Sequence, residues 1–478
     1  WYGDHRDLHY PLRRQRQMCI RDRSQASYYI ESNGEAAIID PLREIDSYIE
    51  KAKKNNVKIK YIFETHFHAD FVSGHLSLSK STGAPIIFGP TSKTSFKSII
   101  AKDGEVFKLG SIKIKALHTP GHTMESTTYL LINSKGKDHA IFTGDTLFLG
   151  DVGRPDLSQK SSKLKNEDLA AILYESITNK IIPLSDDIIV YPAHGAGSAC
   201  GKNLSEKTFG TLGEQKRTNY ALRPNIKKRE FIKEVLEGLD SAPKYFNQNV
   251  KLNKEGYQDV NYIIEKRKKA LTPNEFEIKL KKFNAIILDV RSKDEFSKAH
   301  IPGSIFIGLN GSFAPWVGTI LQDVKTAILI VSPNGREKET IERLARVGFD
   351  NSLGYLKGGI NSWISSGRIV KETKTINVLD FEKIYKKNDL LIYDVRKKDE
   401  FYTESLSNAI NLPLNNIQTN INEFSKKDEF YIHCKTGYRS VIASSYLRLN
   451  GFEKIVNIKS GFEGIKKTNI KINSLISV

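Results

Sequence analysis

Thr65-His66-Phe67-His68-Ala69-Asp70 is the stretch that decides the fold and points to its chemistry. It follows the apolar run Tyr61-Ile62-Phe63, which predicts a buried strand. Alternate residues of an extended segment point the same way, so His66, His68 and Asp70 are expected to converge on one point where the strand ends. Converging imidazole and carboxylate groups are typical metal ligands. The stretch therefore predicts a metal site at a strand end.

Three further turns that contain His or Asp follow apolar runs. They are His118-Thr119-Pro120-Gly121-His122-Thr123, Gly144-Asp145-Thr146-Leu147 and Pro192-Ala193-His194-Gly195. Each comes after a run that predicts a strand, and rigid sheet edges commonly carry functional loops. In this order, the motifs H-x-H-x-D, P-G-H-T, G-D-x-L and P-A-H-G resemble those of the metallo-β-lactamase superfamily. The resemblance covers about residues 24–245, within a first domain placed at 24–257, and implies a four-layer αββα sandwich.

One position departs from the superfamily pattern. Members with two metals usually carry a His directly after the Asp of the first motif, and here that position is Phe71, which cannot bind a metal. The resemblance therefore implies one metal, held by His66, His122 and Asp145. A set of two His and one carboxylate suits Fe(II) that binds both O2 and a substrate sulfur, with zinc as the alternative. The pattern resembles the persulfide dioxygenase branch.

The other polar residues near these motifs leave alternatives open. His68 and Asp70 are expected to orient the ligands, and a ligand role in a two-metal site is their alternative. His194 is expected to be a polar pocket residue rather than a ligand of a second metal. Arg154 either grips an anionic part of the substrate or forms a structural salt bridge. Cys200 either carries a persulfide next to the site or is a buried, inert thiol.

The C-terminal half contains a repeat about one hundred residues long. Ile287-Leu288-Asp289-Val290-Arg291 recurs as Ile392-Tyr393-Asp394-Val395-Arg396, and Lys-Asp-Glu-Phe follows each copy. Strands that alternate with helices indicate parallel α/β sheets. The D-V-R motif and the glycine-rich turn near the end of each copy resemble the rhodanese family. This resemblance places rhodanese-like domains at 258–372 and 373–478.

Cys434-Lys435-Thr436-Gly437-Tyr438-Arg439 points to the chemistry of the second copy. A buried strand leads into Cys434 and a helix is expected after Arg439, so backbone N–H groups at a helix N-terminus would stabilise a thiolate. That thiolate can accept sulfane sulfur as a persulfide. Lys435, Thr436, Gly437 and Tyr438 would surround the substrate, and Arg439 would offer charge-assisted hydrogen bonds. A core cysteine and a phosphatase loop are the alternatives, but the latter has five residues between Cys and Arg.

The first copy departs at the same place. Ser332 stands where the second copy has its cysteine, and the loop that follows, Pro333-Asn334-Gly335-Arg336, is shorter. A serine hydroxyl cannot carry sulfane sulfur. We therefore expect the first copy to be inactive and the second to be active.

Composition limits the other roles. The net charge is +18, from 73 Lys and Arg against 55 Asp and Glu, and the lysines are scattered. Scattered lysines favour a solvated surface over a nucleic-acid interface. Three distant cysteines form no disulfide framework, and no apolar run reaches the roughly 18 residues of a membrane span. With no signal-peptide pattern, a cytoplasmic location is expected, and a homo-oligomer stays open.

Residues 1–23 resemble a translated sequencing adapter, with a basic arm or a targeting peptide as the alternatives. We therefore expect no native fold there, assign no role to Cys19, and expect the first sheet to lack its first strand.

Together the resemblances imply an iron-dependent persulfide dioxygenase, with one Fe(II) per chain, fused to an inactive and an active rhodanese-like domain. Its small-molecule partners would be a thiol persulfide, O2 and sulfite, and its role would be sulfide detoxification. Fusion would raise the local concentration of sulfite near its acceptor. The alternative is a glyoxalase II-like thioester hydrolase that uses metal-bound hydroxide. A third hypothesis is a non-catalytic sulfur-relay protein.

Overall fold

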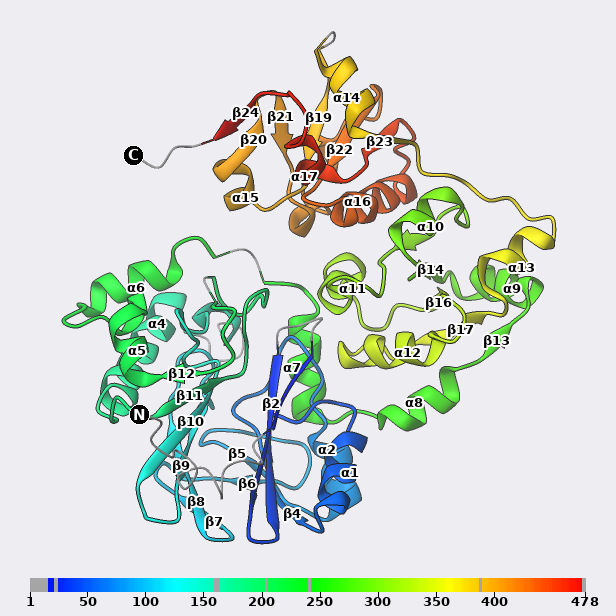
Figure 1. Ribbon diagram of the computed structural model, residues 1–478. Coiled ribbons are helices and arrows are strands. Elements are labelled where there is room, and N and C mark those ends of the chain that lie inside the picture. Colours follow the sequence, from blue (N-terminus) through cyan, green and yellow to red (C-terminus); the bar gives the residue numbers. More distant parts are fainter. Residues whose placement is uncertain are drawn as a thin grey trace, which may run out of the picture. The chain divides into compact units, whose positions relative to one another are not determined.

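The computed structural model describes residues 16–20, 25–158, 164–202, 204–239, 242–386 and 389–474. The chain forms two compact units, which are Trp1–Tyr262 with Ala345–Gly348, and Ile263–Leu344 with Phe349–Val478. Figure 1 labels their elements. No helix within the described ranges is long and apolar enough to cross a membrane.

The first unit contains two sheets (Figure 1). The first sheet has the order β1-β2-β3-β4-β5-β6, with β1 Arg16–Ile20, β2 Gln25–Ser32, β3 Glu35–Ile39, β4 Lys58–Phe63, β5 Ile86–Phe88 and β6 Ile99–Ile100. The second has the order β12-β11-β10-β9-β8-β7, with β7 Val106–Leu109, β8 Ile112–His118, β9 Thr127–Ile132, β10 Asp138–Gly144, β11 Ile189–Pro192 and β12 Gly210–Thr211.

Three apolar clusters define the layers of this unit. One cluster joins the two sheets, with Phe63 of β4 and Tyr129 of β9 among its members. A second lies between the first sheet and the helices α1 Asp46–Lys54 and α2 His75–Thr82, and a third lies between the second sheet and the helices α4 Asn166–Ser176 and α6 Lys228–Leu236. The unit is therefore the αββα sandwich that the motifs predicted. Its other helical elements are η1 Pro155–Ser158, η2 Ile177–Ile181, α5 Leu212–Thr218, η3 Tyr220–Leu222 and α7 Phe246–Glu255, and the division between the two units falls within α8 Val260–Arg267.

The edge of the first sheet differs from the expectation. β1 pairs antiparallel with β2, so backbone from residues 16–20 fills the position where we expected a missing strand. The other residues of the adapter-like segment lie outside the described ranges. The next turn agrees with its sequence, because Asn33 and Gly34 both have positive φ, as a tight hairpin between β2 and β3 requires.

The second unit contains two parallel sheets of the same topology (Figure 1). The first has the order β13-β17-β16-β14-β15, and the second has β18-β23-β22-β19-β21. The strands and helices of the first copy are β13 Ala270–Leu271, α9 Pro273–Phe283, β14 Ile286–Asp289, α10 Lys293–Lys298, β15 Ile305–Phe306, α11 Phe313–Leu321, β16 Ile328–Val331, α12 Glu337–Arg346, β17 Ser352–Leu356 and α13 Gly359–Ser365.

The second copy adds a small two-stranded sheet, β20-β24. Its elements are β18 Thr375–Ile376, α14 Val378–Tyr385, β19 Ile392–Asp394, α15 Lys398–Thr403, β20 Glu404–Leu406, β21 Ala409–Asn411, η4 Leu414–Asn416, η5 Ile421–Glu423, β22 Phe430–His433, α16 Tyr438–Leu449, β23 Ile455–Ile458, α17 Gly461–Ile465 and β24 Ile472–Ser474. The shared strand order confirms that the sequence repeat is a repeat of two parallel α/β domains.

Candidate metal centre and thiol loop

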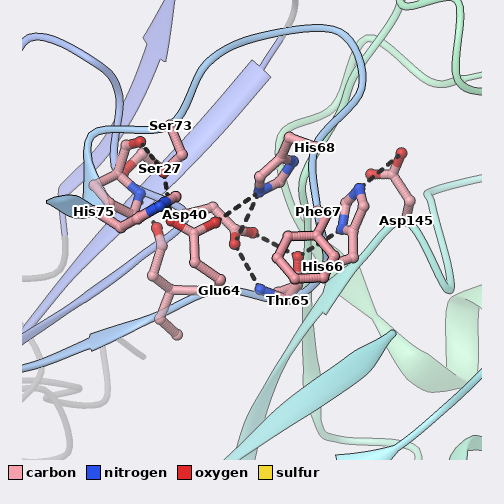
Figure 2. Close-up of polar contacts among 12 residues, drawn as sticks. Ser27, Asp40, Glu64, Thr65, His66, Phe67, His68, Ser73, His75 and Asp145 are labelled. Atoms are coloured by element: carbon pink, nitrogen blue, oxygen red, sulfur yellow. Dashed lines mark hydrogen bonds and ion pairs between the residues drawn. The ribbon is translucent and has the colours of Figure 1, made fainter. Parts of the chain in front are cut away.

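The histidine-rich turn after β4 sends its polar side chains in three directions. His66 faces His122 and Asp145, His68 faces Asp40 and Glu64, and Asp70 lies with His194 and Cys200. Figure 2 shows that the two neighbouring rings have different partners, since His66 contacts Thr65 and Asp145 whereas His68 contacts Asp40 and Glu64. The expectation that His66, His68 and Asp70 converge was wrong, because β4 ends at Phe63 and alternation holds only in extended backbone.

The first group joins His66, His122 and Asp145, all at most 3% exposed. Asp145 Oδ2 lies 3.4 Å from His122 Nε2 and 3.9 Å from His66 Nε2. Neither Asp145 oxygen has a hydrogen-bond partner within the described residues. Buried carboxylate oxygens seldom stay unsatisfied, so these three donors fit a cation between them.

Hydrogen bonds to the far ring nitrogens orient both histidines. His66 Nδ1 lies 2.9 Å from Thr65 Oγ1, whose hydroxyl donates to Asp40 Oδ2, and His122 Nδ1 lies 2.8 Å from the carbonyl oxygen of Arg154. Each ring therefore turns Nε2 towards Asp145. Burial, followed by the neighbouring imidazoles, lowers the pKa of His66 well below its usual value, so that ring stays neutral, as a metal ligand must.

The backbone around this group is closely packed. The Cβ of any other residue at Gly153 would lie 1.9 Å from the carbonyl oxygen of Asp145 and 2.9 Å from His122 Nδ1. Only glycine allows the loop after β10 to pass this close to two of the three donors.

The second group is a buried ion cluster. His68 Nε2 lies 3.1 Å from Asp40 Oδ1 and 3.3 Å from Glu64 Oε2, and His75 Nδ1 lies 3.0 Å from Glu64 Oε1 (Figure 2). Burial disfavours the charge on His68, but the two carboxylates outweigh it and raise its pKa well above the usual value. The ring of Phe71, 1% exposed, packs on His68 at 4.4 Å between centroids. His68 is therefore held away from Asp145 as a paired cation.

Sequence reasoning missed Asp40 and Glu64, although a signal for both existed. Each residue directly follows a strand, β3 or β4, and these strands are parallel neighbours. Carboxyl ends of parallel neighbours lie at the same sheet edge, so the two side chains could have been placed together.

The third group contains Asp70, His194 and Cys200, whose ligand atoms all lie within 4.8 Å of one another. His194 Nε2 is 3.8 Å from Asp70 Oδ2 and 3.5 Å from Asp145 Oδ1. Burial, followed by the carboxylates of Asp145 and Asp70, raises the pKa of the Cys200 thiol well above its usual value. Without a cation nearby, this thiol stays protonated and is a poor nucleophile.

Arg154 forms a salt bridge, which is one of the two roles that the sequence suggested for it. Its Nε and NH2 donate to the two carboxylate oxygens of Asp156 at 2.7 Å each, and NH1 donates to the carbonyl oxygen of Ala199. Its backbone N–H donates to the carbonyl oxygen of Cys200. Arg154 therefore ties the loop that carries Cys200 to the loop after β10.

In the second rhodanese-like copy, Cys434 directly follows β22 and is 1% exposed. The N–H of Gly437 donates to Cys434 Sγ at 3.2 Å, and α16 begins at Tyr438, two residues before the expected start at Ser440. Gly461 has φ +56°, and a Cβ there would lie 2.3 Å from the carbonyl oxygen of Cys434. The glycine-rich turn after β23 is therefore in close contact with the loop that begins at Cys434.

The remaining loop residues have distinct surroundings. Arg439 NH1 and NH2 donate to the two carboxylate oxygens of Glu400 on α15 at 2.6 and 2.8 Å. Burial would raise the pKa of Glu400, but the hydrogen bonds from Arg439 outweigh it and lower that pKa. Lys435 and Thr436 are exposed, whereas the Tyr438 hydroxyl donates to the carbonyl oxygen of Gly308 at 2.8 Å.

Comparison with known proteins agrees with this architecture. The sequence matches the metallo-β-lactamase superfamily over residues 20–194 and the rhodanese-like domain over residues 272–366 and 378–468. A crystal structure of a metallo-β-lactamase from Staphylococcus aureus subsp. aureus COL is 31% identical, with a TM-score of 0.64, and the match covers 72% of this chain and 98% of that one. The chain belongs to the metallo-β-lactamase superfamily.

Two further similarities have lower sequence identity. A probable hydroxyacylglutathione hydrolase of Schizosaccharomyces pombe is 26% identical over 46% of this chain and 90% of its own length. The crystal structure of ETHE1 from Myxococcus xanthus is 27% identical, covers 50% of this chain and 97% of that one, and has a TM-score of 0.43. This metallo-β-lactamase domain therefore carries buried His and Asp groups typical of the superfamily's metal site, fused to rhodanese-like domains.

Proposed function

We propose that this protein oxidises a low-molecular-weight thiol persulfide with O2 and then passes sulfane sulfur to the sulfite that forms. The first step is R–S–SH + O2 + H2O → R–SH + SO3²⁻ + 2 H⁺. The observation that carries the proposal is the occurrence, on one chain, of a buried set of two His and one Asp and of a cysteine loop in a rhodanese-like domain.

In the first step, His66, His122 and Asp145 would hold one Fe(II). This set leaves coordination positions open, and iron there supplies the redox chemistry that O2 needs to react with sulfur. Thr65 and the Arg154 carbonyl keep both imidazoles oriented, with Nε2 towards Asp145. The burial of all three donors excludes bulk water from their neighbourhood.

In the second step, the Cys434 thiolate attacks the outer sulfur of another persulfide. The S–S bond breaks, R–S⁻ leaves and takes a proton, and Cys434 holds the sulfur as Cys–S–S⁻. Sulfite then attacks this outer sulfur, which releases thiosulfate and regenerates the thiolate. The N–H of Gly437 points at Sγ and stabilises the negative charge of the thiolate before attack and after sulfite has taken the sulfur.

A metal-dependent thioester hydrolase is the second candidate, because the curated relative in Schizosaccharomyces pombe is named a probable hydroxyacylglutathione hydrolase. The fused thiol loop favours the sulfur chemistry. Phe71, at the position where two-metal members carry a His, argues in the same direction.

The test is to purify the full chain, measure iron and zinc per chain, and follow O2 consumption with glutathione persulfide and with a glutathione thioester. We expect iron and O2 uptake with sulfite formation, and loss of both in His66→Ala. His118→Ala is the matched control, because His118 Nε2 contacts the carbonyl oxygen of Met124 and lies outside all three groups. Thioester hydrolysis without O2 uptake would contradict the dioxygenase.

A further inference from the structure

Helix α7 (Figure 1) supplies three hydrogen bonds to the turn between β4 and α2. All three come from the side-chain amide of Asn253. Its nitrogen donates to the carbonyl oxygens of His68 and Phe71, and its oxygen accepts from the N–H of Ser73, each at 2.8 Å. An amide has two N–H groups and one oxygen, so every group of this amide has a partner. Asn253 is 1% exposed and lies beyond residues 20–194, the part of the chain that matches the superfamily.

The turn depends on side chains for its hydrogen bonds because it contains neither helix nor strand. Buried backbone N–H and C=O groups need partners, and here no strand ladder supplies them. The N–H of Thr65 donates to Asp40 Oδ1 at 2.8 Å. The N–H of Phe67 donates to Glu125 Oε1 at 3.1 Å. Asn253 serves the last part of the same turn and is the partner that comes from farthest along the chain.

Helix α7 is anchored by contacts other than those of Asn253. The carbonyl oxygen of Lys254 accepts from the N–H of Ser95 at 3.0 Å. The hydroxyl of Tyr257, just after the helix, accepts from the N–H of Leu76 at the start of α2 at 3.1 Å. The helix is therefore fixed to its surroundings on its own account, and Asn253 connects this support to the turn.

The course of the turn matters for the first group, because His66 lies in it two residues before His68. The ring of Phe71 also packs on His68 from the same turn. Without the amide, the buried carbonyl oxygens of His68 and Phe71 would lose a partner, which is costly, and the turn would take another course. His66 would then lose its fixed approach to the other two donors.

We propose that Asn253 is a positioning residue for the metal centre. It holds the turn in one conformation, keeps Nε2 of His66 directed at the first group, and thereby sets how tightly the ion is retained. Partners that orient metal ligands typically change metal affinity by about 10- to 100-fold. This inference rests on the metal site of the proposed function, but not on its reaction.

The test uses the full chain, freed of metal with a chelator and titrated with Co²⁺, whose visible absorption reports the geometry of its ligands. Bands that His66→Ala abolishes belong to the first group. Asn253→Ala should weaken Co²⁺ binding at these bands by about 10- to 100-fold and change their position or intensity. Asn253→Asp should behave in the same way, because a carboxylate of equal shape cannot donate to two carbonyl oxygens.

Asn249→Ala is the matched control. Asn249 lies one turn earlier on α7 and is 0% exposed, and neither atom of its amide group has a hydrogen-bond partner within the described residues. Loss of this second buried amide should leave the Co²⁺ bands and affinity as they are. Unchanged bands and affinity in Asn253→Ala would overturn the proposal, and so would an equal loss in Asn249→Ala.

A second measurement needs no variant, so a folding defect in Asn253→Ala leaves the proposal testable. Coupling between two sites is reciprocal, so Zn²⁺ added to the metal-free, unaltered protein should slow amide hydrogen exchange in residues 67–73 and also in α7. Slower exchange in the turn alone would overturn the coupling to α7. Neither Co²⁺ binding nor exchange depends on O2 uptake. Asn253-dependent metal binding in a protein that consumes no O2 would retain this inference and reject the dioxygenase.

Discussion

The two rhodanese-like copies share a framework and differ at one loop. In both, an Arg folds back onto the buried Asp two residues before it and donates to a backbone carbonyl oxygen. Arg291 pairs with Asp289 and Ala299, and Arg396 pairs with Asp394 and Glu404. The strand order is also the same in both copies.

The loops close differently. Arg439 reaches Glu400 on another helix, whereas Arg336 of the first copy pairs with Glu339 in the first turn of its own helix α12. A Cβ on Gly461 would lie 2.3 Å from the Cys434 carbonyl oxygen, but the corresponding distance from Gly359 to Ser332 is 3.5 Å. The contacts that hold the sheet occur in both copies, while those that close the loop around a thiol occur in the second.

Substitution of Cys434 should have the largest effect on sulfur transfer, because a thiol stands there where the first copy has the hydroxyl of Ser332. Cys434→Ser should lower thiosulfate formation by about 1,000-fold or more, because a hydroxyl cannot hold sulfane sulfur. O2 uptake should persist, and sulfite should accumulate instead. Coupled assays of O2, sulfite and thiosulfate measure this. The matched change Ser332→Ala should alter none of the three, and persistent thiosulfate in Cys434→Ser would reject the role of Cys434.

The shared Asp–Arg pair should contribute similarly to the stability of both copies. Asp289→Ala should lower the free energy of unfolding of the first copy by about 3–5 kcal/mol, because it leaves the buried Arg291 without its carboxylate. Two of the three tryptophans, Trp316 and Trp363, lie in this copy, so the change in tryptophan fluorescence during denaturation reports on it. Asp394→Ala should leave that transition in place and destabilise the second copy, as hydrogen exchange would detect. A shift below about 1 kcal/mol for Asp289→Ala would show the pair to be dispensable.

The loop-closing pair should have an intermediate effect. Arg439→Gln should slow sulfur transfer by about 10- to 100-fold, since one charge-assisted hydrogen-bonding group is worth about 1.5–3 kcal/mol. Arg439→Lys should recover only part of the rate, because an ammonium cannot make the two parallel bonds to Glu400. The matched change Arg336→Gln should leave the rate unchanged. Equal rates for Arg439→Gln and the unaltered protein would remove this residue from the site.

Sequence patterns predicted the sandwich, the repeat and the position of each motif because these depend on periodicity and order. The four motifs do lie where strands of the αββα sandwich end and turns begin. The directions of individual side chains in the first turn were not predictable in this way. Between Phe63 and His75 the backbone is irregular, so the alternation rule has no basis there.

Partners from distant segments were also missed. Asp40 and Glu64 determine where His68 points, and Glu400 determines where Arg439 points. Asp40 and Glu64 lie outside the recognised motifs, and Glu400 belongs to the repeated Lys-Asp-Glu-Phe, which does not reveal its pairing with Arg439. Only the tertiary fold brings each of the three to its partner. Sequence order therefore identified candidate groups, while the packing of neighbouring strands and helices assigned them to separate clusters.

The smallest expected effect tests whether the thiol alone distinguishes the two copies. Ser332→Cys in the Cys434→Ser background should restore no measurable thiosulfate formation. The first loop is one residue shorter between this position and its Arg, and Arg336 is already paired with Glu339 on α12. We expect that a cysteine there would lack an N–H placed like that of Gly437, which donates to Cys434 Sγ and stabilises a thiolate. The rate of alkylation of the new thiol as a function of pH would measure this directly, and an unusually acidic, sulfur-transferring Cys at 332 would show that the framework alone suffices.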